Sequence, residues 1–83
     1  MTHDEIRAGL VDDILRVAPD LAAADITDDA RLADDLGLDS MDRLNLVSAL
    51  CQRFGISIPE VDYHELATPA TAVRYIDDAT DGR

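Results

Sequence analysis

The spacing of apolar residues predicts an amphipathic helix near the start of the chain. Thr2 and Glu5 have the spacing of a capping box, so the helix should begin near His3. The apolar residues that follow recur at helical intervals: Ile6, Leu10, Val11, Ile14, Leu15 and Val17. Pro19 is incompatible with a continuing helix, so we expect the helix to end before it.

Residues 19–39 have no single period. Their apolar positions are unevenly spaced, and Gly37 permits a backbone turn. The acidic residues that interrupt them include Asp28, Asp29, Asp34 and Asp35. A connection of this length is unusual in a compact domain unless it is functional or contains a short helical turn. We expect its scattered leucines to hold it across the ends of the helices.

The clearest helical pattern covers residues 40–54, and Gly55 suits the position after the helix end. At about 100° per residue, one face is apolar and is assigned to the core: Leu46, Val47, Leu50 and Phe54. A second face lies near Ser40 and contains Met41, Leu44, Asn45, Ser48 and Gln52. Met41 and Leu44 either cover the preceding loop or form a docking surface, and the sequence leaves both interpretations open.

The last third of the chain predicts one short and one longer helix. Pro59 disfavours helix at Ile58, and residues 60–66 fit a short helix. Thr68 and Pro69 suit the N-cap and first position of a helix. Its packed residues should be Ala72, Val73, Tyr75 and Ile76, followed by a flexible polar tail over residues 77–83. The whole pattern predicts an all-α fold with a long first connection, in a single domain over residues 1–83.

Composition narrows the class of protein. The chain has a net charge of −11 and no lysine, and only 4% of its residues are aromatic. Such a charge disfavours nucleic acid and anionic membranes as partners and attracts basic proteins. Solubility alone is the other explanation of the acidic composition. Cys51 is the single cysteine, which excludes an internal disulfide and a cysteine-based metal site. Without a signal-peptide pattern or a membrane-length apolar run, we expect a cytoplasmic protein.

The sequence lacks the patterns of a catalytic or metal site. A calcium-loop count from Asp25 places Ala30 where glycine is needed and Leu36 where glutamate is needed. His3 and His64 are distant and lack the spacing of zinc ligands. Ser40 is not in a nucleophile elbow, and glycine-rich phosphate loops are absent. We therefore expect a protein that is not an enzyme and has no metal site.

The segment around Ser40 offers different chemistry. Asp39 and Ser40 precede the strongest helix, so the hydroxyl should be exposed at its N-terminus. A serine in this place is most often an N-cap, and its loss would cost about 1 kcal/mol. The same place also favours a phosphate ester, because backbone N–H groups and the helix dipole attract negative charge.

The residues that surround this serine resemble a known family. Residues 35–42, Asp-Leu-Gly-Leu-Asp-Ser-Met-Asp, closely resemble the prosthetic-group attachment motif of acyl carrier proteins. The resemblance continues through Leu46, Leu50, Phe54, the Ile58-Pro59 pair and residues 68–76, and so covers nearly the whole chain.

The resemblance implies a four-helix bundle, made of three longer helices and one short helix, with Ser40 carrying 4′-phosphopantetheine. A separate phosphopantetheinyl transferase would transfer the group from coenzyme A, and its thiol would then hold acyl groups as thioesters. Acyl-loading and acyl-processing enzymes with basic patches would be the other partners of a monomeric carrier. The residues that would dock them are Asp39, Met41, Asp42, Leu44, Asn45 and Ser48.

One departure from the family pattern bears on the pathway. Carriers of bulk fatty acid synthesis usually have several acidic residues along the second helix, whereas this chain has Arg43, Asn45, Ser48, Gln52 and Arg53 there. A specialised lipid or polyketide-type pathway is therefore expected. Two alternatives remain: an aminoacyl or peptidyl-type carrier loaded by an adenylating ligase, and an unmodified acidic helical module. Peptidyl carriers have Gly-Gly-x-Ser at this site, and this chain has Gly-Leu-Asp-Ser.

Overall fold

The computed structural model describes residues 1–81, and every regular element in that part of the chain is helical. The α-helices are α1 (His3–Val17), α2 (Ser40–Phe54) and α3 (Pro69–Asp81). Two 3₁₀ elements complete the fold, η1 (Ala23–Asp25) in the long loop and η2 (Glu60–Leu66) before α3. The predicted all-α bundle with three longer helices and one short helix is confirmed.

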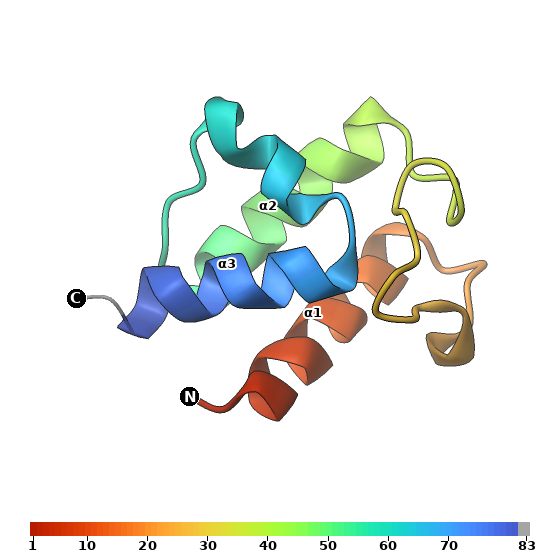
Figure 1. Ribbon diagram of the computed structural model, residues 1–83. Coiled ribbons are helices and arrows are strands. Elements are labelled where there is room, and N and C mark those ends of the chain that lie inside the picture. The colour runs from red at the N-terminus through yellow and green to blue at the C-terminus, as the bar shows by residue number, and fades with distance from the viewer. Residues whose placement is uncertain (82–83) are drawn as a thin grey trace.

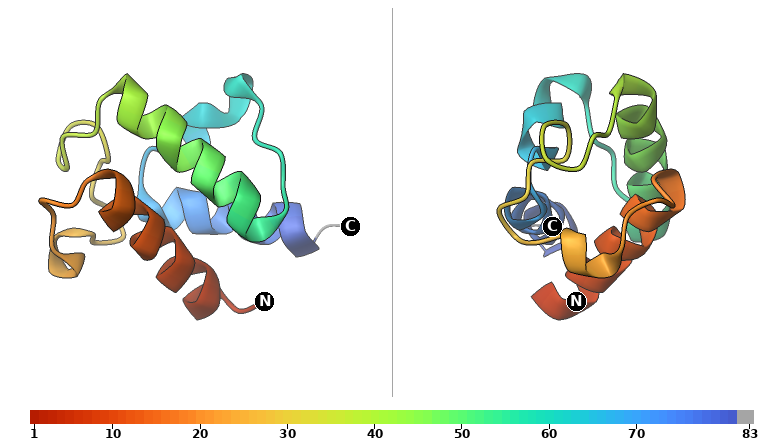
Figure 2. Two further views of the ribbon diagram at one scale, coloured as in Figure 1. Left: turned by 180° about the vertical axis from the view of Figure 1, so that it is seen from behind. Right: turned by 90° about the vertical axis from the view of Figure 1, so that its right-hand side faces the viewer.

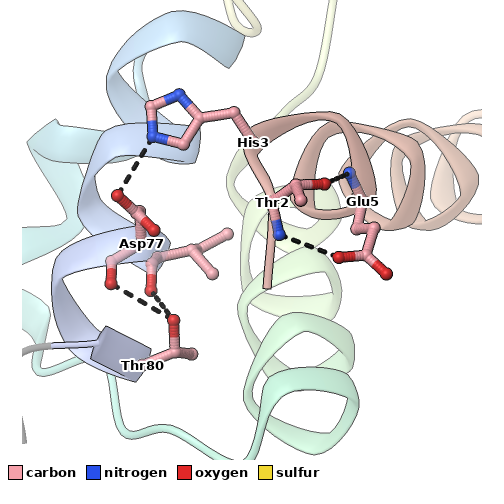
Figure 3. A network of polar contacts seen from close by, with 6 residues as sticks. Thr2, His3, Glu5, Asp77 and Thr80 are labelled. Atoms are coloured by element: carbon pink, nitrogen blue, oxygen red, sulfur yellow. Dashed lines mark hydrogen bonds and ion pairs between the residues drawn. The ribbon is translucent and has the colours of Figure 1, made fainter.

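The helices pack around α1, which contacts both α2 and α3, while η2 packs against α3 (Figures 1 and 2). The long loop leaves the end of α1 and returns to the start of α2 at one end of the molecule (Figure 1). The capping box at the start of α1 is formed as predicted. Thr2 Oγ1 accepts from the Glu5 amide at 3.1 Å, and Glu5 Oε1 accepts from the Thr2 amide at 2.8 Å (Figure 3). These hydrogen bonds lower the pKa of Glu5.

The core is aliphatic and includes residues from every long element. The predicted core positions of α2 are buried, except that Phe54 is half-buried against the cluster. The loop also contributes, as expected from its leucines. The buried apolar residues of the cluster are Ile6, Leu10, Ile14, Ile26, Leu32, Leu38, Leu46, Val47, Leu50, Ile56, Ile58, Leu66, Ala72, Val73 and Ile76.

Hydrogen bonds fix the loop against the helices. The Leu32 amide donates to the Ala67 carbonyl at 3.0 Å, and the Leu38 amide donates to the Leu32 carbonyl at 2.9 Å. Nearer to α1, the Arg7 guanidinium donates to the Ile26 carbonyl at 2.8 Å and to Asp28 at 2.9 Å. Although the loop is long, hydrogen bonds therefore attach it to α1 on one side and to the segment after η2 on the other.

A buried ion pair joins α1 to α2. The Asp13 side chain is 2% exposed, and its two oxygens accept hydrogen bonds from Arg53 Nε at 3.0 Å and Arg53 Nη2 at 2.9 Å. The hydrogen bond to Asp13 raises the pKa of Arg53. The Arg53 side chain passes close to Gly9 on α1. A Cβ atom added at Gly9 would lie 2.8 Å from Arg53 Cδ and 3.0 Å from Phe54 Cζ. The Asp13–Arg53 ion pair and the absence of a side chain at Gly9 together set how closely α1 and α2 approach.

The predicted flexible tail is wrong for residues 77–81, which continue α3; residues 82–83 lie outside the described part. Three contacts accompany this extension of the helix. Ala79 packs against the core, and His3 Nε2 lies 3.0 Å from Asp77 Oδ2 (Figure 3). Thr80 Oγ1 also donates to the Ile76 carbonyl at 2.9 Å, so its hydroxyl is satisfied within the helix. The residues of this segment are mostly polar, so the sequence analysis did not predict that they would make these contacts.

Tyr75 ties α3 to η2. Its hydroxyl donates to Asp62 Oδ2 at 2.8 Å. Burial, with the hydrogen bond to Asp62 second, raises the pKa of Tyr75 to about 12. The neutral phenol is therefore the form that the folded protein favours.

We expect Asp13→Ala to lower the free energy of unfolding by about 2–3 kcal/mol. Removal of one member of a buried pair leaves the other charge uncompensated, and the loss is moderated because the Arg53 side chain is 34% exposed and can regain water. Urea denaturation followed by circular dichroism measures the change. An exposed aspartate on α3 supplies the control: Asp78→Ala should stay within about 0.5 kcal/mol of wild type. Equal effects of the two substitutions would contradict the role given to the pair.

Tyr75 should make stability depend on alkaline pH. A pKa raised from about 10 in the unfolded chain to about 12 in the folded protein stabilises the fold fully below pH 10. That contribution is lost as the pH rises from 10 through 12. Ultraviolet titration of Tyr63→Phe, which leaves Tyr75 as the single tyrosine, should give the higher midpoint while circular dichroism shows a folded protein. A midpoint near pH 10 would contradict the burial of the Tyr75 phenol and its hydrogen bond to Asp62.

Candidate functional site at the start of helix α2

Ser40 is the first residue of α2 and its side chain is exposed. Two neighbours set this position. Gly37 has φ of +76°, a conformation that suits glycine, and turns the chain towards the helix. Leu38 is buried in the core and anchors the segment two residues before the serine. The hydroxyl is therefore presented to solvent from a fixed backbone.

The N-cap of α2 is Asp39, and the prediction that Ser40 has this role is wrong. Asp39 Oδ1 accepts from the Asp42 amide at 2.8 Å, and Asp42 Oδ2 accepts from the Asp39 amide at 3.3 Å, which completes a capping box. Because an aspartate already fills the cap, the Ser40 hydroxyl has no hydrogen-bond partner among residues 1–81. The cap energy of about 1 kcal/mol belongs to Asp39, and the serine remains free for chemistry.

Charges of both signs surround the hydroxyl. The amides of Ser40 and Met41 donate to no carbonyl within the described chain, so the positive end of the α2 dipole faces the site. Arg43 lies one helical turn on, and the Asp39 and Asp42 carboxylates supply the negative side. The helix end and Arg43 fit a phosphate ester on Ser40. The Asp39 and Asp42 carboxylates are engaged in the capping box, and neither accepts a hydrogen bond from the Ser40 hydroxyl.

The second face of α2 is exposed. Met41 is 65% and Leu44 is 50% exposed, so neither covers the loop. Asn45 and Ser48 are exposed as well. Of the two interpretations left open by the sequence, the structure excludes loop packing and leaves two large apolar side chains in solvent beside Ser40.

A cleft of about 480 Å³ lies beside the first turn of α2, and the sequence analysis did not predict it. Its walls come from the loop, the first turn of α2 and η2 with the residues after it. The lining includes Arg31, Leu38, Arg43 and His64. No sequence signal pointed to it, because the lining residues come from three separate segments.

Other candidate chemistry is not assembled. No cluster of three or more potential metal-ligating side chains occurs within residues 1–81. His3 and His64 occupy different elements, as their separation in the sequence suggested. Cys51, whose exposure the sequence left open, is half-buried beside the core. Across the described helices, none has both the length and the hydropathy that crossing a bilayer requires.

Comparison with known proteins agrees with the geometry. Residues 9–76 match the family profile described as "Phosphopantetheine attachment site". The chain is 37% identical over 76 residues to an acyl carrier protein of Chloroherpeton thalassium, covering 92% of this chain and 94% of that one. It is 34% identical over 74 residues to an acyl carrier protein of a Sulfurovum species, covering 89% and 92%. The matched region contains the exposed serine and most of the core, and the chain therefore belongs to the acyl carrier protein family, whose members are carriers with covalent 4′-phosphopantetheine and not enzymes.

Proposed function

We propose that Ser40 is the attachment site of 4′-phosphopantetheine and that the protein presents acyl thioesters on this arm to partner enzymes. The observation that carries the proposal is the exposed hydroxyl at the start of α2, which is free of hydrogen bonds because Asp39 caps the helix. A mobile arm needs an anchor whose own position is fixed, and the capping box together with buried Leu38 supplies one.

Ser40 acts as the nucleophile of the attachment step. Its Oγ attacks the β-phosphorus of coenzyme A, the bond from that phosphorus to the bridging oxygen breaks, and adenosine 3′,5′-bisphosphate leaves. The transferase would remove the serine proton and hold the Mg²⁺, because the Asp39 and Asp42 carboxylates are already engaged in the capping box of α2. The free amides at the start of α2 and the positive charge of Arg43, three residues on, would favour the negative charge of the phosphodiester that results. The thiol of the arm then holds the acyl group.

The docking surface that we propose surrounds the serine. It consists of Asp39, Met41, Asp42, Leu44, Asn45 and Ser48. The carboxylates would meet basic residues of the transferase and of acyl-processing enzymes, where charge mainly raises the rate of encounter. Exposed Met41 and Leu44 would supply the apolar contact of a short-lived complex.

The charge of α2 supports a specialised lipid or polyketide-type pathway, for a monomeric carrier in the cytoplasm. Beyond Asp42 the exposed face is neutral at Asn45, Ser48 and Gln52, and Arg43 adds a positive charge. Arg53 is engaged inward with Asp13. Partners that select this surface therefore need fewer basic residues than partners of a helix that is acidic throughout.

The Ser40→Ala variant should lose all loading and keep its fold. Intact mass is measured after incubation with coenzyme A, Mg²⁺ and a promiscuous phosphopantetheinyl transferase. Wild type should gain one phosphopantetheinyl group and the variant none, while the free energy of unfolding changes by less than about 0.5 kcal/mol, because the hydroxyl makes no bond.

The control is Ser57→Ala, which removes an exposed hydroxyl outside the proposed docking surface and should load normally. Loading of Ser40→Ala would overturn the assignment of the site. If two unrelated transferases both fail to load folded wild type, the unmodified interaction module becomes the better account. Incubating the loaded protein with an amino acid and an adenylating ligase separates an aminoacyl carrier from an acyl carrier.

The Asp39→Asn substitution isolates charge from capping. Asparagine caps a helix about as well as aspartate, so the fold should persist while one negative charge of the docking surface is lost. We expect the kcat/KM of the transferase to fall roughly two- to fivefold at low salt, as for one exposed ion pair, and the difference to shrink at high salt. The control is Asp20→Asn, an exposed loop position. Equal effects would mean that net charge alone attracts the transferase.

A further inference from the structure

Arg43 is the one cationic residue in the first turn of α2, which begins at Ser40. Its backbone amide donates to the Asp39 carbonyl at 2.9 Å, and its side chain is exposed. Three other arginines of the described chain form an ion pair with an aspartate, namely Arg7, Arg31 and Arg53. Arg43 forms no ion pair within residues 1–81, so its guanidinium is available to another anion.

The two carboxylates nearest to Arg43 in the sequence are engaged by the backbone. Asp39 Oδ1 accepts from the Asp42 amide, and Asp42 Oδ2 accepts from the Asp39 amide. The start of α2 therefore has a net negative charge, with two carboxylates and a single guanidinium. An anion attached to Ser40 would be repelled by both carboxylates and attracted by Arg43. The arginine is thus the natural partner of any negative charge added to the serine.

Helix geometry brings the Arg43 side chain within reach of Ser40. Residues three apart are neighbours on a helix surface, with Cβ atoms about 5–6 Å from each other. Each Cα–Cβ bond also tilts towards the helix N-terminus, so a long side chain extends back over the preceding turn. The Arg43 guanidinium can therefore reach a group attached to the serine. A cation in the first turn is unfavourable beside the helix dipole, and an anion on Ser40 would offset that cost.

Arg43 lies on one flank of Ser40, and the exposed apolar residues lie on the other. At about 100° per residue, Met41 and Leu44 lie at roughly +100° and +40° from Ser40 around the helix axis, and Arg43 lies at roughly −60°. The residues that line the cleft include Arg43 and neither Met41 nor Leu44. A phosphodiester held by Arg43 is therefore drawn away from Met41 and Leu44, which stay exposed.

We propose that Arg43 is a positioning residue for the arm: its guanidinium binds the phosphodiester on Ser40 and starts the arm on the cleft side of α2, away from Met41 and Leu44. A planar guanidinium fits two oxygens of a phosphate with paired hydrogen bonds. The inference rests on the proposed function, because the phosphodiester exists only when the arm is on Ser40. Both partners are exposed, so the bound position should be favoured over the free one by roughly two- to fivefold.

The wild-type protein tests the contact without any substitution. A promiscuous transferase loads it from coenzyme A, intact mass verifies the product, and NMR spectra of the arginine Nε–H groups are compared before and after loading. The Arg43 resonance, assigned by its loss in Arg43→Gln, should shift on loading. The resonance of Arg16, an exposed arginine of α1 that also forms no ion pair within residues 1–81, should stay in place. The Arg43 shift should shrink between roughly 0.01 M and 1 M salt, because the Debye length falls from about 30 Å to about 3 Å.

Signals of the arm itself report the other side of the contact. The phosphorus resonance of the loaded protein should move in Arg43→Gln and stay unchanged in Arg16→Gln. It should move less in Arg43→Lys, which keeps the charge and loses the paired geometry. The two geminal methyl groups of the arm lie close to its phosphate, and they should give Overhauser contacts to Arg43 that are stronger than those to Met41 and Leu44. In Arg43→Gln the preference for this flank should disappear.

Three results would overturn the proposal. An unchanged Arg43 resonance in fully loaded wild type would show that the guanidinium does not meet the phosphodiester. Equal movement of the phosphorus resonance in Arg43→Gln and Arg16→Gln would assign the effect to net charge alone. Overhauser contacts to Met41 and Leu44 as strong as those to Arg43 would refute the direction given to the arm. A failure of folded wild type to load in the mass spectrum is a different outcome and would count against the proposed function itself.

Discussion

The approach of α1 to α2 is the constraint on which the remaining structure depends. Asp13 is the one charged side chain buried within the described chain, and both of its oxygens are used by Arg53. A buried carboxylate tolerates little displacement of its partner, because any gap leaves a desolvated charge uncompensated. Gly9 allows the Arg53 side chain to pass close to the α1 backbone. The axis of α2, and with it the direction in which Ser40 points, is thereby set from the far end of the helix.

At the near end of α2, structural and chemical roles fall on different residues. Asp39 caps the helix, Leu38 anchors it in the core, and Gly37 supplies the turn. None of these roles needs the Ser40 hydroxyl, which is why it is free. The two exposed apolar residues beside it, Met41 and Leu44, likewise lie outside the packed core. A surface that contributes nothing to stability is available for recognition.

The sequence predicted most of the fold, because local signals determine most of it. The Thr2 and Glu5 capping box and the period of α2 are visible within a few residues of sequence. What could not be predicted depends on contacts between distant segments. The Asp13–Arg53 pair joins residues forty positions apart, and the extension of α3 depends partly on His3 meeting Asp77. The assignment of the cap to Ser40 failed for a local reason, since Asp39 and Ser40 are both good caps and only the backbone angles distinguish them.

The capping of α2 by Asp39 has a consequence for the order of events in the cell. If the arm is attached at Ser40 as proposed, attachment would break no hydrogen bond of the scaffold, and the unmodified and modified proteins would present the same helix and the same proposed docking surface. A transferase that recognises this surface would bind its own product about as well as its substrate. Turnover would then be subject to product inhibition, which downstream enzymes would relieve by binding the released carrier through the same face.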